Sequence, residues 1–335
     1  MRRAAPLLAA VAVVATAAAC GGGGRRSIVV YNGQHLELTR AFASAFERSS
    51  GISVRLRTND AVVLADQLLQ EGGSSPADVY LSENSPELVN LEEHDVLAPL
   101  SPALLRRVPA EDSSPNGKWI GIALRVGSLV YNPKLLQRSQ LPVSVLDLAG
   151  PQWKGKVAVA PLDSDFPPVV GAVIATKGAD AAGEWLAGLK RNAAVYSSAE
   201  AVVAAVNRGD VAAGLVNQYY WYRLRREVGA GGMHSTVYYF PRGDVGSVVN
   251  IAGAAVVASS KHREDAERFV SFLVSREGQK LIAAGDDFEY PARPGVAPNA
   301  ALPALDRVAH ARLRAGTLGD DREAAELIVR AGFGS

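Results

Sequence analysis

The sequence predicts an α/β protein of two lobes, each built on a mixed sheet flanked by helices, with a ligand cleft between them. Three observations support this prediction. The chain has 335 residues, 48% of them hydrophobic, which suits two domains better than one. Short apolar segments alternate with amphipathic helical ones. Near the middle, residues 119–131 form longer apolar stretches around Arg125, as expected where one lobe is inserted into the other.

The first part of the chain alternates strand and helix. Its clearest helix follows residue 35, because Leu38, Phe42, Ala45 and Phe46 fall on one face and Gly51 ends the pattern. Short connections of this kind are typical of parallel strands. The other elements that we predict here are strands at 27–31, 52–58 and 77–81, and helices at 62–70 and 86–93.

The second part continues with the same kinds of element. We predict strands at 156–160, 211–216 and 251–258, and helices at 167–177, 180–190, 200–207, 219–228, 263–275, 277–284 and 320–331. The predicted lobes are residues 27–123 plus 249–300, and residues 124–248 plus 301–335. In such proteins a ligand binds where strand ends and helix starts converge.

The N-terminus is typical of an export signal. Two arginines precede an apolar run of about sixteen residues, which is short for a membrane span. Small residues then lead to Cys20 and four glycines. We predict a signal peptide at 1–19, a lipidated Cys20 and a Gly-rich tether through residue 26; an ordinary signal peptide with a chance cysteine is the alternative. Cleavage removes two of the 35 basic residues, so 33 remain against 34 acidic ones.

Several functions are excluded by composition and motifs. A single cysteine rules out a disulfide framework or a cysteine-based zinc or iron–sulfur site. The formal charge of +1 argues against a protein that coats nucleic acid. No nucleotide-binding loop, nucleophile motif or metalloprotease motif is present, and the five histidines show no catalytic spacing. We therefore expect no enzyme activity, and a secreted hydrolase is improbable.

Polar or aromatic side chains follow three of the predicted strands. They lie in segments 31–35, 78–84 and 217–222, and include His35, Glu83, Tyr219 and Tyr220. A histidine or glutamate at a helix start is more often a cap or a surface group, and an aromatic run is more often core. Adjacent helical residues, however, diverge by about 100°, so the two tyrosines reach one point only where the chain enters the helix.

One imidazole, one carboxylate and two phenols form a specific set of donors. Phenolate and carboxylate oxygens are hard anionic ligands, and a highly charged cation favours their ionised forms. Zinc sites favour His and Cys, whereas Mg²⁺ and Ca²⁺ prefer carboxylates, carbonyls and water. Ferric iron fits this set best. Fe³⁺ with Glu83, Tyr219 and Tyr220 ionised is neutral, which suits a partly buried cleft.

These segments resemble the ferric-ion-binding proteins that serve bacterial ABC iron importers. The most specific motif is VNQYYWY at 216–222, and the resemblance runs over about residues 27–310. It implies a type II periplasmic-binding-protein fold with Fe³⁺ held by His35, Glu83, Tyr219 and Tyr220. The resemblance carries over Asn217 as a contact to an accompanying anion or to a ligand, and Arg125 to neutralise that anion or to orient a phenolate. Ser164, Asp165 and Ser198 stand at the family's other anion positions, where this chain departs from the family pattern. Asp163 and Asp165 would repel that anion, so water, hydroxide or an organic chelate is an alternative.

The resemblance also implies a role and partners. We expect a monomeric, extracytoplasmic solute-binding lipoprotein, anchored to the cell membrane, that closes on Fe³⁺ and delivers it to an ABC permease with its ATPase. No nucleic acid partner is expected. One alternative is the same fold binding thiamine, a polyamine or a phosphonate by stacking on Tyr219, Tyr220 and Trp221. Another is a lipoprotein that reports iron to a membrane kinase.

Overall fold

The computed structural model describes residues 26–241, 243–308, 310–314 and 316–334. The predicted signal peptide at 1–19, the predicted lipidation site Cys20 and all but residue 26 of the tether lie outside this part of the chain. None of the helices in the described residues is both long enough and apolar enough to span a membrane.

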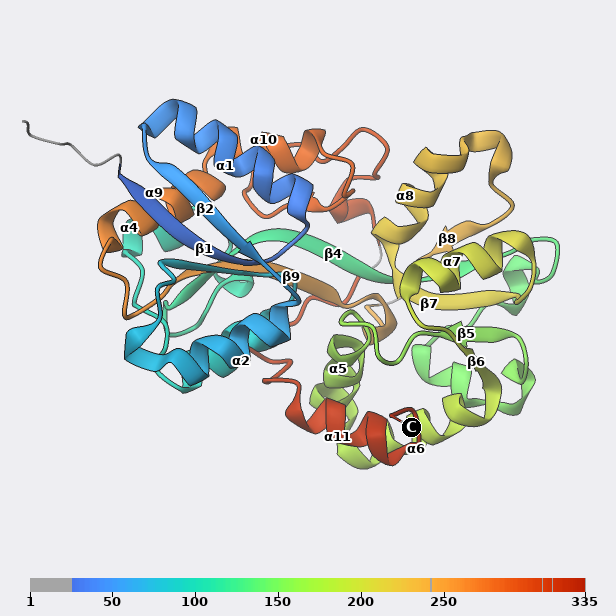
Figure 1. The fold of residues 1–335 in the computed structure, drawn as a ribbon. Helices are drawn as coiled ribbons and strands as arrows, with labels where there is room; N and C mark the ends of the chain where they lie inside the picture. Colours follow the sequence, from blue (N-terminus) through green and yellow to red (C-terminus); the bar gives the residue numbers. More distant parts are fainter. Residues whose placement is uncertain (1–25, 242, 309, 315, 335) are drawn as a thin grey trace, which may run out of the picture.

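Ten strands join into one mixed sheet that runs through both lobes (Figure 1). Eight of them follow the order β2-β1-β3-β9-β4-β7-β5-β6, and β8 and β10 pair with β4. The strands are β1 (Ser27–Gly33), β2 (Ser53–Thr58), β3 (Val79–Ser82), β4 (Trp119–Tyr131), β5 (Val157–Val159), β6 (Ala193–Val195), β7 (Ala213–Asn217), β8 (Thr236–Tyr238), β9 (Val249–Val256) and β10 (Tyr290–Pro291).

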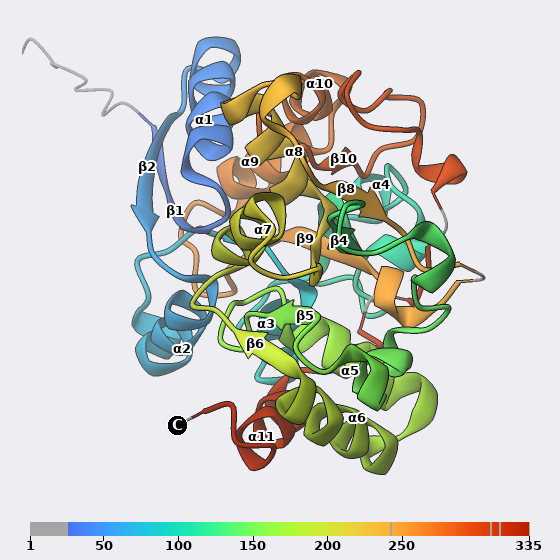
Figure 2. The same ribbon diagram turned by 90° about the vertical axis from the view of Figure 1, so that its right-hand side faces the viewer.

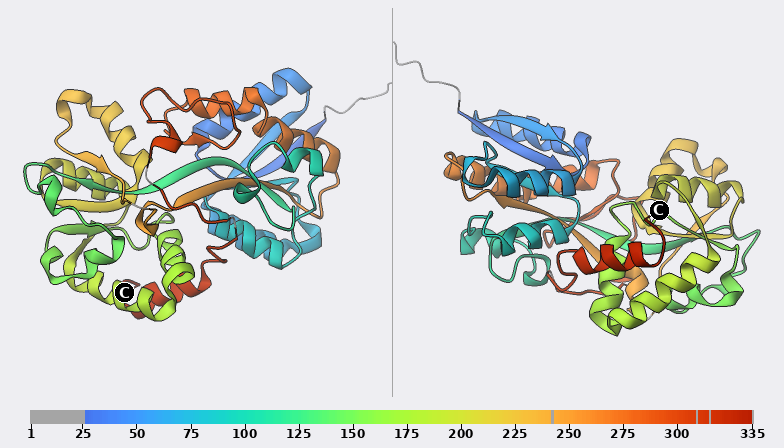
Figure 3. Two further views of the ribbon diagram at one scale, coloured as in Figure 1. Left: turned by 180° about the vertical axis from the view of Figure 1, so that it is seen from behind. Right: turned by 60° about the horizontal axis from the view of Figure 1, so that its bottom comes forward.

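Helices cover the two ends of this sheet and so define two lobes. In one lobe, β1–β3 are surrounded by α1, α2, α3, α9 and α10 (Figure 3). In the other lobe, one side of β5 and β6 is covered by α7 and α8, and the opposite side by α5, α6 and α11 (Figure 2). The helices are α1 (Leu36–Ser50), α2 (Ala61–Glu71), α3 (Ser85–Glu93), α4 (Pro102–Leu105), α5 (Pro167–Lys177), α6 (Ala179–Asn192), α7 (Ala199–Arg208), α8 (Gln218–Val228), α9 (Arg263–Leu273), α10 (Arg276–Ala284) and α11 (Arg322–Arg330).

Strand β4 belongs to both lobes. Its first half pairs antiparallel with β9, and Gly127–Tyr131 pairs antiparallel with β7. All thirteen residues of β4 are buried, as expected for a strand covered on both faces. The sheet is therefore mixed, as predicted, because β4 and β9 run between the lobes as an antiparallel pair. Parallel pairing holds for β1 with β2 and β3, and for β5 with β6 and β7.

The helical patterns were predicted well. The predicted face of α1 is buried, and Gly51 ends the helix with φ of 72°, in the left-handed region. In α11, Ala324 and Ile328 are buried in the core of the lobe that contains α5 and α6. Each fully buried aliphatic side chain of this kind contributes roughly 1.5–3 kcal/mol to folding.

Candidate functional site

The four predicted metal ligands lie at strand-to-helix junctions. His35 follows β1 and precedes α1, and Glu83 follows β3 and precedes α3. Tyr219 and Tyr220 begin α8 directly after β7, where the chain enters the helix. Each junction lies at the carboxyl end of a strand, where ligands of open α/β sheets bind. The two lobes thus contribute two side chains each.

These junctions meet across the cleft. The Nδ1 atom of His35 lies 2.9 Å from Oε1 of Glu83, within one lobe. The His35 ring lies 5.4 Å from the Tyr219 ring of the other lobe, and the rings of Tyr219 and Tyr220 are 3.9 Å apart between centroids. Within the described part of the chain, the buried Nε2 atom of His35 has no hydrogen-bond partner. A buried donor without a partner is costly unless a ligand completes it.

Glu83 controls the protonation of His35. Burial lowers the pKa of His35, but the hydrogen bond and charge of Glu83, together with the charges of Glu289 and Asp287, raise it to about 9. Burial in turn raises the pKa of Glu83, yet His35, Arg125 and Arg223 hold it below its ordinary value. Without a cation the pair is therefore an imidazolium with a carboxylate, and a metal must displace the imidazolium proton.

The two tyrosines face two aspartates of the loop after β5. The Tyr219 hydroxyl donates to Asp165 over 3.0 Å, and the Tyr220 hydroxyl donates to Asp163 over 3.4 Å. Burial, followed by the charge of Asp165, raises the pKa of both phenols well above their usual range. They consequently stay protonated until a strongly charged cation enters. Burial and the charge of Asp165 also raise the pKa of Asp163 to about 6.

Arg125 is the buried positive charge at the centre of the site. It lies in β4, with 0% of its surface exposed. Its Nη1 is 3.4 Å from Asp165 and 3.7 Å from Glu83, and its Nε is 3.7 Å from Glu289. It also donates to Asn84 over 2.7 Å. One guanidinium is therefore close to three carboxylates, which come from both lobes and from the segment before β10. Its positive charge offsets the cost of burying these negative charges.

The other residues predicted to contact an anion have different surroundings. Asn217 is buried at the N-cap position of α8, and its side-chain oxygen accepts a 3.5 Å hydrogen bond from Asn250. Ser198 caps α7, since its hydroxyl accepts from the amide of Ala201. The backbone oxygen of Ser164 accepts from Asn84 over 3.2 Å, which joins the lobes. Ser198 is thus already engaged by its own helix.

Sequence reasoning missed Glu289, Asp287 and Gln34. Glu289 is fully buried, and burial raises its pKa to about 7. Gln34 contacts Glu289 over 3.5 Å and accepts from the His35 amide over 2.6 Å. Glu289 comes from the irregular segment before β10, which no periodicity predicts. The only signal was an acidic run directly before Tyr290 in a largely apolar region.

Further contacts hold the lobes together around the site. Gln218 of α8 donates to the backbone oxygen of Phe288 over 3.0 Å, and the ring of Tyr222 lies 5.9 Å from that of Phe288. Arg226 of α8 pairs with Asp286, with both side chains more than half exposed. These contacts join segments of the two predicted lobes next to the site. In the described residues no three His, Cys, Asp or Glu side chains converge on one metal position.

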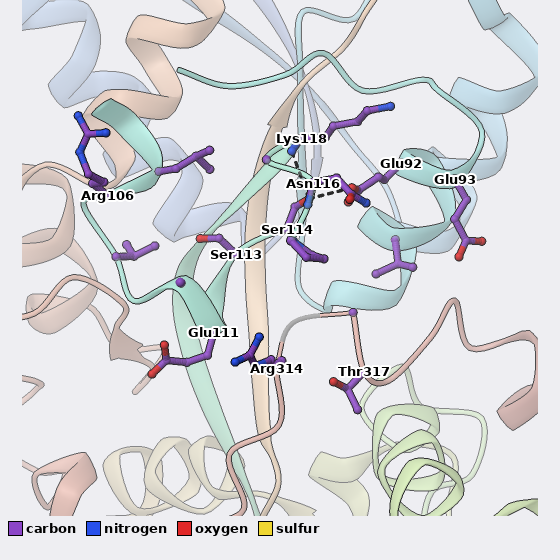
Figure 4. A pocket seen from close by; sticks show the side chains of 17 residues that line it. Glu92, Glu93, Arg106, Glu111, Ser113, Ser114, Asn116, Lys118, Arg314 and Thr317 are labelled. Carbon is purple, nitrogen blue, oxygen red and sulfur yellow. Dashed lines mark hydrogen bonds between the residues drawn. The ribbon is translucent and has the colours of Figure 1, made fainter. Parts of the chain in front are cut away.

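A large cavity lies elsewhere in the molecule. It has a volume of about 1120 Å³, between the end of α3, the segment before β4 and the chain around Arg314 (Figure 4). Its charged side chains have both signs, among them Glu92, Arg106 and Lys118. None of the predicted site residues is among the described residues that line it.

The sequence matches the family model of bacterial extracellular solute-binding proteins over residues 74–312. The chain belongs to this family. It is 38% identical over 306 residues to the Fe(3+)-binding periplasmic protein of Serratia marcescens, which covers 91% of this chain and 90% of that relative. The major ferric iron-binding protein of Neisseria meningitidis serogroup B is 35% identical over 308 residues, with coverage of 91% and 93%.

Solved structures of the solute-binding family confirm the predicted fold. Iron-bound HitA from Pseudomonas aeruginosa superposes with a TM-score of 0.87 at 39% identity, covering 92% of this chain and 99% of that one. The predicted two-lobed type II architecture and the predicted resemblance to ferric-ion-binding proteins are both confirmed by these comparisons.

Proposed function

We propose that this solute-binding protein captures Fe³⁺ between its lobes through His35, Glu83, Tyr219 and Tyr220. The observation that carries the proposal is that these four side chains lie next to one another at the interface between the lobes. In addition, the Nε2 atom of His35 is buried and has no hydrogen-bond partner in the described chain. The ferric-iron names of its relatives support it. In this proposal the cation replaces the His35 proton and ionises both phenols, which burial otherwise keeps neutral.

The surroundings of the tyrosines argue against a required exogenous anion. Asp165 contacts both the Tyr219 hydroxyl and Arg125, and Asp163 contacts Tyr220. Two carboxylates next to the phenols repel phosphate or carbonate, while Arg125 compensates the negative charge that they add. We therefore propose that the protein's own carboxylates take the place of an accompanying anion, and that Asn217, Ser164 and Ser198 position neighbouring chain segments.

The test is to load the purified protein with ferric citrate and to record the visible spectrum. Tyrosinate–iron charge transfer should give a coloured band, which the Tyr219→Phe/Tyr220→Phe variant should lack. Acidification to about pH 4 should release the iron, because protons compete for every donor. A colourless protein that retains no iron would contradict the proposal and favour an organic solute.

We also propose how the protein is exported, anchored and coupled to a transporter. The N-terminal segment would direct export, cleavage after residue 19 would expose Cys20, and its lipid would anchor the protein outside the cytoplasm. The lobes, residues 27–123 plus 249–300 and 124–248 plus 301–335, would then deliver Fe³⁺ as a monomer to an ABC permease with its ATPase. Replacing Cys20 by Ala should move the protein from the membrane fraction to the soluble one; unchanged fractionation would contradict the anchor.

A further inference from the structure

A second cavity lies between the lobes, away from the four predicted ligands. Its volume is about 450 Å³, and it is bounded by α2 and α3 on one side and by the starts of α5 and α11 on the other. Helices α2 and α11 border the same side of the molecule in Figure 1. Of the predicted site residues, only Ser164 is among those described as lining it. The Asn84–Ser164 hydrogen bond marks its boundary toward Arg125.

Two carboxylates line this cavity, one from each side. Glu87 of α3 is 7% exposed, and its Oε2 accepts a hydrogen bond from the Ser82 hydroxyl over 2.9 Å. Asp321, just before α11, has a buried Oδ1 with no partner in the part of the chain that the structure describes. One carboxylate comes from each lobe. A buried oxygen such as Asp321 Oδ1 is costly unless a donor or a cation completes it.

The charge of the cavity lining is strongly negative. Asp66 and Asp320 line it together with Glu87 and Asp321, whereas Arg322 is the one lysine or arginine among its described lining residues. Arg322 already pairs with Asp320 and lies 3.7 Å from Glu93. Burial raises the pKa of Glu87 to about 7, and burial with the charge of Glu87 raises that of Asp321. Both shifts are what carboxylates without a counter-charge undergo.

The cavity wall indicates the kind of cation. Leu69 and Ala65 of α2, and Pro167 and Ala325 of the other lobe, give the wall an apolar character. The volume is far larger than a bare metal ion needs and lies within the range of small-molecule sites. No three metal-ligating His, Cys, Asp or Glu side chains converge anywhere in the described chain. An ammonium group on a short hydrocarbon chain matches both the carboxylates and the apolar wall.

We propose that this cavity binds a small aliphatic amine, with an ammonium group between Glu87 and Asp321 and the hydrocarbon chain against Leu69 and Pro167. The amine would contact both lobes, so it would stabilise the closed conformation. Because coupling between two ligands is reciprocal, an amine bound here should also tighten the binding of cargo in the cleft.

The experiment is calorimetric titration of the purified protein with 1,4-diaminobutane and, separately, with 1,4-butanediol. The two probes share a carbon chain and differ in charge. We expect the diamine to bind with a dissociation constant of about 1 mM or below and the diol not to bind. Equal binding of both probes, or no binding of the diamine, would overturn the proposal.

Two variants refine the test. Glu87→Gln/Asp321→Asn should weaken diamine binding by about tenfold or more, since it removes two charge-assisted contacts. Glu323→Gln is the matched control, because Glu323 is an exposed carboxylate on α11 outside the lining of this cavity. The far-ultraviolet circular dichroism of each variant verifies folding. Unchanged diamine affinity in the folded double variant would contradict the assignment, and the diol comparison decides the matter without any variant.

Discussion

The two lobes supply different halves of the cleft. His35 and Glu83 have side chains that are 15% and 18% exposed, and they come from two separate junctions of one lobe. Tyr219 and Tyr220 are only 1% and 6% exposed, and they are neighbours at a single junction of the other lobe. A buried, locally fixed pair is pre-organised, whereas the protonation of the imidazole depends on the charge of its carboxylate partner. The tyrosine half is therefore suited to affinity and the histidine half to the control of capture by pH.

The largest effect should come from the tyrosine half. Tyr219→Phe removes one phenol that contacts Asp165 and adjoins His35. We expect iron affinity, measured by competition with citrate, to fall by more than the roughly 100-fold that loss of an outer contact of a metal site costs. Tyr222→Phe is the control, because Tyr222 lies on the same helix and packs against Phe288 instead. Equal losses in both variants would remove the distinction between the lobes.

A smaller effect is expected from the histidine half. Glu83→Gln keeps the shape of the side chain but removes its charge, so iron affinity should fall, though by less than in Tyr219→Phe, because the amide oxygen can still reach the cation. The same change should lower the pKa of His35 from about 9, because Glu83 provides the largest opposing influence to burial. Nuclear magnetic resonance titration of the imidazole in the iron-free protein measures this directly. An unchanged His35 pKa would show that the pair does not act as a unit.

A still smaller effect concerns the aspartates. Added phosphate should leave the iron affinity of the unaltered protein within about twofold, whereas Asp165→Asn should make affinity depend on phosphate. The reason is that the variant removes a carboxylate that repels an anion while Arg125 remains beside the vacated charge. Ser198→Ala is the control, since that hydroxyl caps α7. Phosphate dependence in the unaltered protein would favour the exogenous anion.

The smallest effect is on the iron-free fold. The pKa of His35 is raised from 6.5 to about 9, so the pair with Glu83 contributes stability that is complete below pH 6.5. This contribution is lost as pH rises through about 9. Urea unfolding between these limits should show declining stability, and His35→Gln should flatten that decline. A flat profile in the unaltered protein would mean that the imidazolium is not stabilised in the native state.

Much of this architecture could be predicted because local patterns determine it. The buried face of α1 and the left-handed Gly51 follow from periodicity and glycine chemistry, and the three strand-end segments follow from the polar residues after apolar runs. The antiparallel crossing of β4 and β9 could not be predicted, since strand pairing between residues 119–126 and 249–255 is non-local. For the same reason Glu289 was missed: its burial beside Arg125 depends on long-range packing of an irregular segment.

Arg125 lies in the strand that the two lobes share. Half of β4 pairs with β9 and half with β7, and Arg125 lies at the transition between these pairings. Should the lobes separate, Glu83 and Asp165 would move apart with their own lobes, and Arg125 would lose one or both of these neighbours while Glu289 remains close to it. A guanidinium with fewer carboxylate neighbours would repel a trivalent cation in the cleft more strongly. The charge that balances the site in this conformation would then favour unloading.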